Sequence, residues 1–219
     1  MASKGQVHFA SVILDVDLTL CTIEGINWLA ARRDPSVASR VADLTRKAMN
    51  GDAPLETVYG DRLAAIRPNR TDVAALAAAY QDAVSPGAVQ ALAAFRSRGV
   101  KIVAVTSGIR DAVLPMASAL GFTPADVFAV DIRFDDKGNY AGFVAETPLV
   151  KASGKREIVE QLALPRRRLM VGDGSTDALV RPAVDAFAAF TGVIRRDGVA
   201  RDANYVVASF EALERIVLS

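Results

Sequence analysis

Short runs of apolar residues recur along the chain, most of them followed by polar residues. The runs lie at 9–14, 100–105, 127–130, 169–171 and 186–190. Runs of this length, rich in Val, Ile, Leu and Phe, are typical of strands that are buried on both faces of a sheet. We therefore expect these segments to form the strands of one buried sheet.

Helical patterns lie between these runs. Ser85-Pro86 has the pattern of an N-cap followed by proline in the first turn, and Gly99 suits the end of the same helix. The residues expected on its inner face are Val89, Leu92, Ala93 and Phe95. A second helix is expected after Ser153, with Ile158, Val159 and Leu162 facing inward. Alternating strands and helices predict an α/β fold, with a Rossmann-like parallel sheet flanked by helices.

The segment 23–84 does not follow this alternation. It has helical patterning without a convincing strand, and it carries turn sequences at 51–54 and 67–70. We expect a small helical bundle inserted after the first strand, forming a cap domain (23–84) on an α/β core domain (1–22 and 85–219). A lid over the strand ends is its natural role, because open parallel sheets bind ligands there. The alternative is a set of extra helices packed on the sheet.

A β-hairpin is predicted in the second half of the chain. The turn-forming sequence Asp135-Asp136-Lys137-Gly138-Asn139 separates the short segments 132–134 and 140–143.

Composition narrows the functional classes. The 219 residues carry 26 basic and 25 acidic side chains, so nothing favours binding to nucleic acid or to an anionic membrane. Cys21 and His8 are the single cysteine and histidine, which excludes an internal disulfide, a cysteine-rich zinc site and histidine-based triads. No apolar run reaches about 18 residues and no secretory signal is apparent, so we expect a cytoplasmic protein.

Polar residues suited to phosphoryl chemistry follow three of the predicted strands. Asp15 and Asp17 follow the first, Thr106-Ser107-Gly108 the second, and the segment from Gly172 to Asp177 the third. By itself, the aspartate pair is equally typical of a turn that caps a helix. The other strand ends favour a site, because the carboxyl ends of parallel strands meet at one edge of the sheet.

Residues of these types can bind a metal ion and a phosphoryl group. Carboxylate oxygens bind hard cations, and an octahedral oxygen environment favours Mg²⁺. Lys155, at the start of the helix that leads to the third strand, and the cation can bind phosphoryl oxygens, and an aspartate can act as the nucleophile.

The motifs resemble those of the haloacid dehalogenase superfamily of phosphatases. The four matching segments are Asp15-x-Asp17-x-Thr19, Ser107-Gly108, Lys155 and Gly172-Asp173-Gly174-Ser175-Thr176-Asp177. Nearly the whole chain is similar to the phosphoserine phosphatases of that superfamily. Further matching segments are Glu24-Gly25-Ile26, Met49, Pro54-Leu55, Arg62-Leu63 and Tyr140-Ala141-Gly142-Phe143.

The resemblance implies a role for each catalytic residue. Asp15 is the expected nucleophile that forms an aspartyl-phosphate, and Asp17 is the expected general acid and base. Ser107 and Lys155 are expected to bind phosphoryl oxygens. The expected Mg²⁺ ligands are Asp15, the Asp17 carbonyl and Asp173, supported by Asp177.

The resemblance also implies hydrolysis of L-phosphoserine to L-serine and phosphate, by a monomer or a homodimer. Glu24 is expected to pair with the substrate ammonium group and Arg62 with its carboxylate. The complete expected substrate-binding set is Glu24, Met49, Leu55, Arg62, Ser107, Gly108, Lys155 and Thr176.

Some positions depart from the family pattern. They are Leu18 for the usual Ser, Leu55 for Phe, Ile109-Arg110 for Gly-Phe and Val130-Asp131 for Asn-Arg. These departures leave two related alternatives: a phosphatase for another small phosphomonoester, and a phosphotransferase that passes phosphate to homoserine. A phosphoacceptor signalling domain also combines a parallel sheet, Mg²⁺ and a phosphorylated aspartate, but Asp17 and the inserted segment argue against it.

Overall fold

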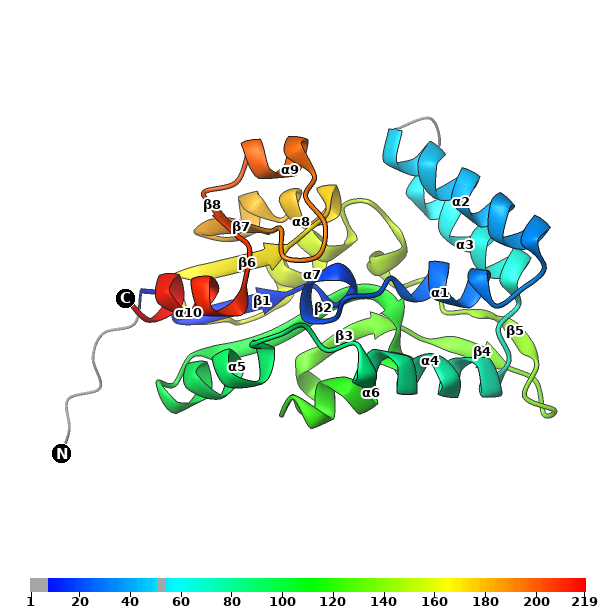
Figure 1. The fold of residues 1–219 in the computed structure, drawn as a ribbon, viewed down its shortest axis with the longest axis horizontal. Helices are drawn as coiled ribbons and strands as arrows, with labels where there is room; N and C mark the ends of the chain where they lie inside the picture. The colour runs from blue at the N-terminus through cyan, green and yellow to red at the C-terminus, as the bar shows by residue number, and fades with distance from the viewer. Residues whose placement is uncertain (1–7, 51–53) are drawn as a thin grey trace.

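A parallel sheet forms the centre of the molecule (Figure 1). The computed structural model describes residues 8–50 and 54–219. Its main sheet has six strands in the order β3-β2-β1-β6-β7-β8. The strands are β1 (Ser11–Leu14), β2 (Lys101–Ile109), β3 (Val127–Val130), β6 (Arg168–Gly172), β7 (Ala186–Phe190) and β8 (Tyr205–Val207). All five predicted strands are confirmed, and β8 is an additional strand at one edge of the sheet.

The strand β1 lies in the middle of the sheet and is buried along its whole length. It pairs in parallel with β2 on one side and with β6 on the other. The carboxyl ends of these three strands therefore meet at one edge, as expected for the three motif-bearing segments. The strand β2 continues to Ile109, four residues beyond the predicted end of its apolar run.

Helices cover both faces of the sheet. The helices α5 (Ala88–Ser97), α6 (Arg110–Ala119) and α10 (Phe210–Leu218) lie on one face, and α7 (Gly154–Gln161) and α8 (Ser175–Ala178) lie on the other (Figure 1). The helix α9 (Asp197–Arg201) precedes β8. Short helical turns are η1 (Val16–Leu20), η2 (Pro124–Asp126), η3 (Pro148–Val150) and η4 (Arg181–Ala183).

The predicted start of α5 was wrong. The N-cap is Gly87, while the Ser85 hydroxyl donates to the Thr19 carbonyl at 2.6 Å. The predicted inner face was partly right: Leu92 and Phe95 are buried, whereas Val89 is 54% exposed and Ala93 is also exposed. Ala88 and Ala91 complete the buried set. This set follows the i, i+3, i+4, i+7 spacing, which small alanines obscured in the sequence. Gly99 does end the helical segment, with a φ of 78°. Ser153 is the N-cap of α7, as predicted.

The segment 23–84 is helical, as predicted. Its described residues form α1 (Gly25–Ala31), α2 (Pro35–Asn50), α3 (Leu55–Ile66) and α4 (Arg70–Asp82). The helices α2 and α3 lie side by side and project beyond the sheet, whereas α4 packs along α6 (Figure 1). The predicted turn at 67–70 joins α3 to α4, and residues 51–53 of the other predicted turn lie outside the described residues.

The predicted hairpin is present as β4 (Ile132–Phe134) and β5 (Tyr140–Phe143), which pair in antiparallel fashion. The Phe143 ring makes an edge contact with Tyr59 of α3, at 5.3 Å between ring centroids. The Arg70 N–H at the start of α4 donates to the Gly138 carbonyl at 3.0 Å. The hairpin is thus attached to the inserted helices.

No helix in the described residues is long and apolar enough to cross a membrane.

Candidate active site

The segment that follows β1 directs two carboxylates to different neighbours. The Asp15 N–H donates to the Val171 carbonyl at 2.9 Å, which fixes this residue at the carboxyl end of the central strands. The chain then turns tightly through η1, where Leu18 has a φ of 56°. Such a left-handed residue other than glycine costs about 1–3 kcal/mol and is held by its surroundings. As a result, Asp15 contacts Lys155 while Asp17 contacts Tyr80.

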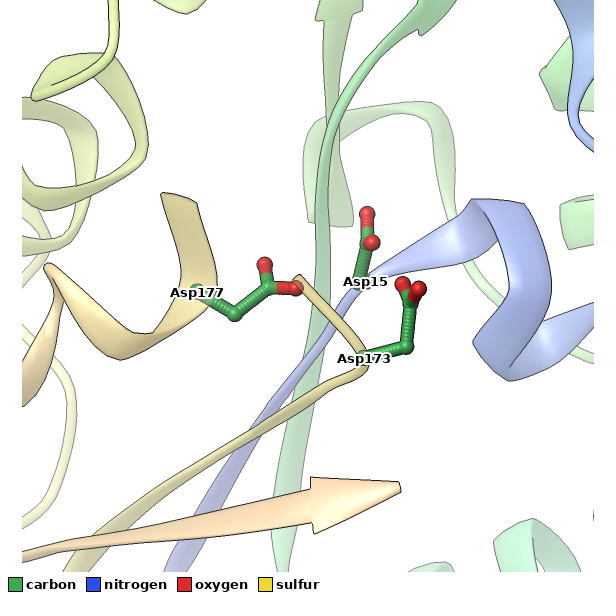
Figure 2. Close-up of side chains that lie close together, drawn as sticks. All are labelled: Asp15, Asp173 and Asp177. Atoms are coloured by element: carbon green, nitrogen blue, oxygen red, sulfur yellow. The ribbon is translucent and has the colours of Figure 1, made fainter. Parts of the chain in front are cut away.

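Three buried carboxylates converge at this edge of the sheet. Figure 2 shows Asp15 after β1, Asp173 after β6 and Asp177 in α8, with their side chains gathered around a common space. One oxygen from each lies within 4.8 Å of the others. An all-oxygen set of this kind fits a hard divalent cation. The expected contribution of Asp17, a backbone carbonyl, stays a prediction.

Lys155 lies against this cluster. Its ammonium nitrogen is 2.6 Å from Asp15 Oδ1 and 2.7 Å from Asp177 Oδ1. Burial alone would lower the pKa of Lys155, but the two aspartates more than offset that effect, so its pKa is raised. The lysine therefore remains a cation throughout the physiological pH range.

The start of α7 fits closely against η3, which fixes the position of Lys155. A Cβ atom on Gly154 would lie 1.8 Å from the Pro148 carbonyl oxygen. Glycine is the residue that permits this approach, because it has no side chain.

The acidic cluster carries more negative charge than its neighbours neutralise. Burial raises the pKa of Asp15 well above its ordinary value, and Asp177 and Asp173 add to this increase. The pKa of Asp173 is also raised, by burial and by Asp177. A bound cation would relieve this repulsion, so the electrostatics agree with the geometry.

Arg196 is a member of the site that the sequence analysis missed. It precedes α9, and its Nε donates to Asp173 Oδ2 at 3.1 Å. Arg195 beside it instead pairs with Asp197 on the surface. No motif or periodicity in the sequence separates these two arginines.

Asp17 has the surroundings of a carboxyl group that can exchange a proton near neutral pH. Burial, reinforced by the negative charge of Glu24, raises the pKa of Asp17 to about 7. Hydrogen bonds from the Tyr80 hydroxyl, at 2.6 Å, and from the Gly25 N–H oppose the increase without cancelling it. The sequence analysis did not single out Tyr80.

Ser107 faces the same site from β2. Its hydroxyl donates to the Leu149 carbonyl at 2.6 Å, and its own carbonyl accepts from the Tyr59 hydroxyl at 2.9 Å. The adjacent Gly108 N–H donates to the Thr106 hydroxyl at 2.9 Å. Tyr59 is a further residue that the sequence analysis did not single out, and it joins α3 to this loop.

Glu24 and Arg62 lie close together and line the same cavity as Asp15 and Asp17. Glu24 is the N-cap of α1, and its Oε1 is 3.7 Å from Arg62 Nη2. Arg62 Nη1 donates to the Thr45 hydroxyl of α2 at 3.2 Å. Within the part of the chain that the structure describes, the buried Arg62 Nε has no hydrogen-bond partner. A buried guanidinium with a spare donor is suited to an incoming anion.

A cavity of about 120 Å³ connects these groups. Its lining includes the predicted site residues Asp15, Asp17, Glu24, Leu55, Arg62, Ser107, Lys155, Asp173, Thr176 and Asp177. Leu18, Tyr59, Thr106, Gly174 and Arg196 complete the lining. The predicted Gly108 adjoins Ser107 without lining the cavity. Met49 lies in α2, and its side chain is outside the described residues.

Two positions that depart from the family pattern pair with each other. Arg110 Nε lies 3.0 Å from Asp131 Oδ1, and Arg110 Nη1 donates to the Val127 carbonyl at 2.8 Å. Arg110 is thereby directed along β3, and Ile109 is buried in the core. Neither side chain lines the cavity.

The sequence of the chain is similar to those of known hydrolases. Residues 10–183 match the sequence family described as haloacid dehalogenase-like hydrolase. The chain is 32% identical to human phosphoserine phosphatase over 93% of its own length and 91% of that protein. It is 31% identical to a phosphoserine phosphatase of Arabidopsis thaliana described as chloroplastic, over 93% of this chain and 70% of the relative.

The fold also matches solved structures. A phosphoserine phosphohydrolase-like protein from Francisella tularensis superposes with a TM-score of 0.84 at 19% identity, covering 96% of this chain and all of the other. At this identity, the match supports the fold.

Proposed function

The chain belongs to the haloacid dehalogenase-like hydrolase family, and from this premise we propose that it hydrolyses L-phosphoserine to L-serine and inorganic phosphate. The observation that carries the proposal is one cavity that joins the Asp15–Asp17 pair to the Glu24–Arg62 pair. The first pair supplies phosphoryl-transfer chemistry, and the second can recognise a free amino acid. The similarity to human phosphoserine phosphatase supports the same substrate.

The first half of the reaction transfers the phosphoryl group to the protein. The Asp15 carboxylate attacks phosphorus, and the bond between phosphorus and the serine oxygen breaks. Asp17 donates its proton to that oxygen, so serine leaves with a neutral hydroxyl group. The pKa of about 7 for Asp17 keeps a substantial fraction protonated near neutral pH.

The second half restores the protein. Asp17, now a carboxylate, removes a proton from a water molecule that attacks the phosphorus of the aspartyl-phosphate. The bond between Asp15 and phosphorus breaks, and phosphate is released. Lys155 and Ser107 bind phosphoryl oxygens through both steps, and Lys155 also offsets their negative charge.

We infer that the acidic cluster binds Mg²⁺ during the reaction. Asp15, Asp173 and Asp177 would hold the ion. Arg196, which pairs with Asp173, would offset part of the negative charge of that carboxylate. When bound, the ion supplies positive charge that stabilises the phosphoryl oxygens.

Recognition of serine is assigned to the groups on the inserted helices. Glu24 would pair with the substrate ammonium group, and the spare donor of Arg62 would bind its carboxylate. Thr176 and Leu55 would complete the wall around the substrate. We assign the cap role to 23–84 because its helices carry Glu24, Leu55 and Arg62.

The test measures phosphate release with Mg²⁺ from phosphoserine, phosphoethanolamine, phosphothreonine and phosphohomoserine. We expect phosphoserine to be preferred in wild type. Because phosphoethanolamine has no carboxylate, Arg62→Ala should raise the KM for phosphoserine by about 10- to 100-fold and leave phosphoethanolamine almost unchanged. The exposed Arg40→Ala serves as the matched control. A wild-type protein that leaves phosphoserine intact while hydrolysing another ester would overturn the proposed substrate.

A further inference from the structure

Tyr80 reaches the catalytic site from the inserted helices. It is the last member of the buried stripe of α4, after Val73, Leu76 and Ala77. Its side chain is fully buried, and its hydroxyl donates to Asp17 Oδ1 at 2.6 Å. Because α4 packs along α6, a helix of the core, the ring is fixed relative to the sheet (Figure 1).

Gly25 makes room for this hydroxyl, and Gly108 lies within ordinary contact distance of it. A Cβ atom on Gly25 would lie 2.1 Å from the Tyr80 oxygen, and a Cβ on Gly108 would lie 3.6 Å from it. The hydroxyl therefore lies between the start of α1, the end of β2 that carries Ser107, and Asp17. A buried hydroxyl needs a hydrogen-bond partner, and here that partner is the proposed general acid and base.

We propose that Tyr80 is a positioning residue that holds the Asp17 carboxyl group in its reactive orientation. The Tyr80 O–H donates to Oδ1, which acts as the acceptor oxygen. The exchangeable proton is then on Oδ2, and we assign to this oxygen the proton transfer to the leaving group and later the one from the attacking water. This role rests on the proposed phosphatase function, in which Asp17 performs both proton transfers.

Tyr80 keeps its own proton in this arrangement. Burial and the nearby Asp17 charge raise the pKa of the Tyr80 hydroxyl well above its ordinary value. It orients Asp17 by donation and does not transfer a proton to substrate.

The test compares two substrates with different leaving groups. Serine must be protonated as it leaves phosphoserine, whereas acetate leaves acetyl phosphate as a stable carboxylate. We expect Tyr80→Phe to lower kcat/KM for phosphoserine by about 10-fold, part of the contribution of a general acid. The value for acetyl phosphate should change by less than about 2-fold, because this step needs no proton. Tyr205→Phe, on the edge strand β8, is the matched control and should match wild type on both substrates.

A second measurement asks whether Tyr80 acts through Asp17. In an Asp17→Asn background, adding Tyr80→Phe should change the single-turnover rate with phosphoserine by less than about 2-fold. Equal losses of Tyr80→Phe on both substrates, or a full loss that persists in the Asp17→Asn background, would overturn the proposal and leave Tyr80 a packing residue.

The outcomes also separate this inference from the proposed function. Wild-type protein without phosphoserine hydrolysis contradicts the function, whereas an active wild type with an equally active Tyr80→Phe contradicts the positioning role alone.

If Tyr80→Phe does not fold, Gly25→Ala replaces it, because the added Cβ displaces the hydroxyl and keeps the ring. This variant should show the same dependence on the leaving group, and equal activity on both substrates relative to wild type would again reject the role.

Discussion

At the scale of single residues, the site shows how two carboxylates of identical chemistry acquire different surroundings. Asp15 contacts Lys155 and shares its surroundings with Asp173 and Asp177. Asp17, two positions later, contacts Tyr80 and has no lysine within hydrogen-bond distance among the described residues. The first is suited to attack phosphorus as an anion, and the second is suited to hold and return a proton.

Asp17→Asn should separate the two halves of the reaction. With acetyl phosphate, Asp15 should still accept the phosphoryl group, because acetate leaves without a proton. The aspartyl-phosphate should then persist, because the attacking water has lost its base. Intact-protein mass spectrometry should show one added phosphoryl group, and the Asp15→Asn/Asp17→Asn double variant should show none. Equally slow loss of phosphate from wild type and Asp17→Asn would instead favour a receiver-like role.

At the scale of helices and strands, the site depends on how closely a few elements approach. The helix α7 meets η3 at Gly154, and the next residue is Lys155. The helix α4 packs along α6 and brings Tyr80 to Asp17. The family departures at Arg110 and Asp131 join the start of α6 to the end of β3 instead of reaching the cavity. These two residues therefore affect the packing of α6 against β3 more directly than they affect substrate preference.

Gly154→Ala tests the approach of α7 to η3. The added Cβ would lie 1.8 Å from a backbone oxygen, so the helix start must shift and Lys155 with it. We expect a loss of about 2 kcal/mol or more in the free energy of unfolding, together with a fall in kcat. Chemical denaturation and steady-state kinetics measure the two effects.

Gly198→Ala in α9 is the matched control for this substitution. A Cβ on Gly198 would have no heavy atom within 4 Å, so its effect should be neutral or stabilising by up to about 1 kcal/mol. Equal stability of the two variants would contradict the assigned close contact at Gly154.

At the scale of the whole molecule, the inserted helices and the core meet through polar contacts near the carboxyl ends of β1 and β2. Tyr59 of α3 donates to the Ser107 carbonyl, and Tyr80 of α4 donates to Asp17. The β4–β5 hairpin supports α3 from the outside through Phe143. A small cavity thus lies beside a buried acidic cluster. The expected cytoplasmic location and the expected monomer or homodimer stay predictions.

The stability of the metal-free protein should fall as the pH rises. The pKa of Asp17 is about 7 in the folded protein, and the pKa values of Asp15 and Asp173 are also raised. An unfolded aspartate has a pKa of about 3.9, so the folded state binds more protons between pH 4 and about 7. In the presence of a chelator, we expect Tm to fall by at least about 5 °C between pH 5 and pH 8. Asp17→Asn should reduce this slope, and a Tm that rises with pH would contradict the assignment.

Mg²⁺ should stabilise the protein most strongly at high pH. At 100 times its Kd, a ligand that binds the folded state alone adds about 2.7 kcal/mol, equivalent to roughly 5–10 °C in a chain of this size. The increase should be smaller at pH 5, where protons compete for the carboxylates. Asp173→Asn should reduce the increase, and Asp197→Asn, on the surface, should leave it unchanged. An equal response from the two variants would exclude the acidic cluster as the metal site.

Local patterns in the sequence were enough to predict five of the six strands of the main sheet, the helical insertion, the hairpin and most of the residues that line the cavity. These features follow from local patterns: short apolar runs form buried strands, and polar residues after parallel strands gather at one edge. The same reasoning placed Asp15, Asp173, Asp177 and Lys155 near each other without knowledge of their distances. It was less successful for α5, where alanines gave little contrast between the buried and exposed faces.

The groups that complete the site could not be predicted from local patterns, because they come from distant parts of the chain. Tyr80 is 63 positions from Asp17, and Arg196 is 23 positions from Asp173. A buried tyrosine in a helical stripe has the same sequence pattern whether its hydroxyl meets a carbonyl, a water molecule or a catalytic carboxylate. The partner depends on the angle and depth at which α4 packs on α6, and on the room left by Gly25. Long-range packing sets these quantities, so the orientation of the Asp17 carboxyl group is a property of the folded molecule.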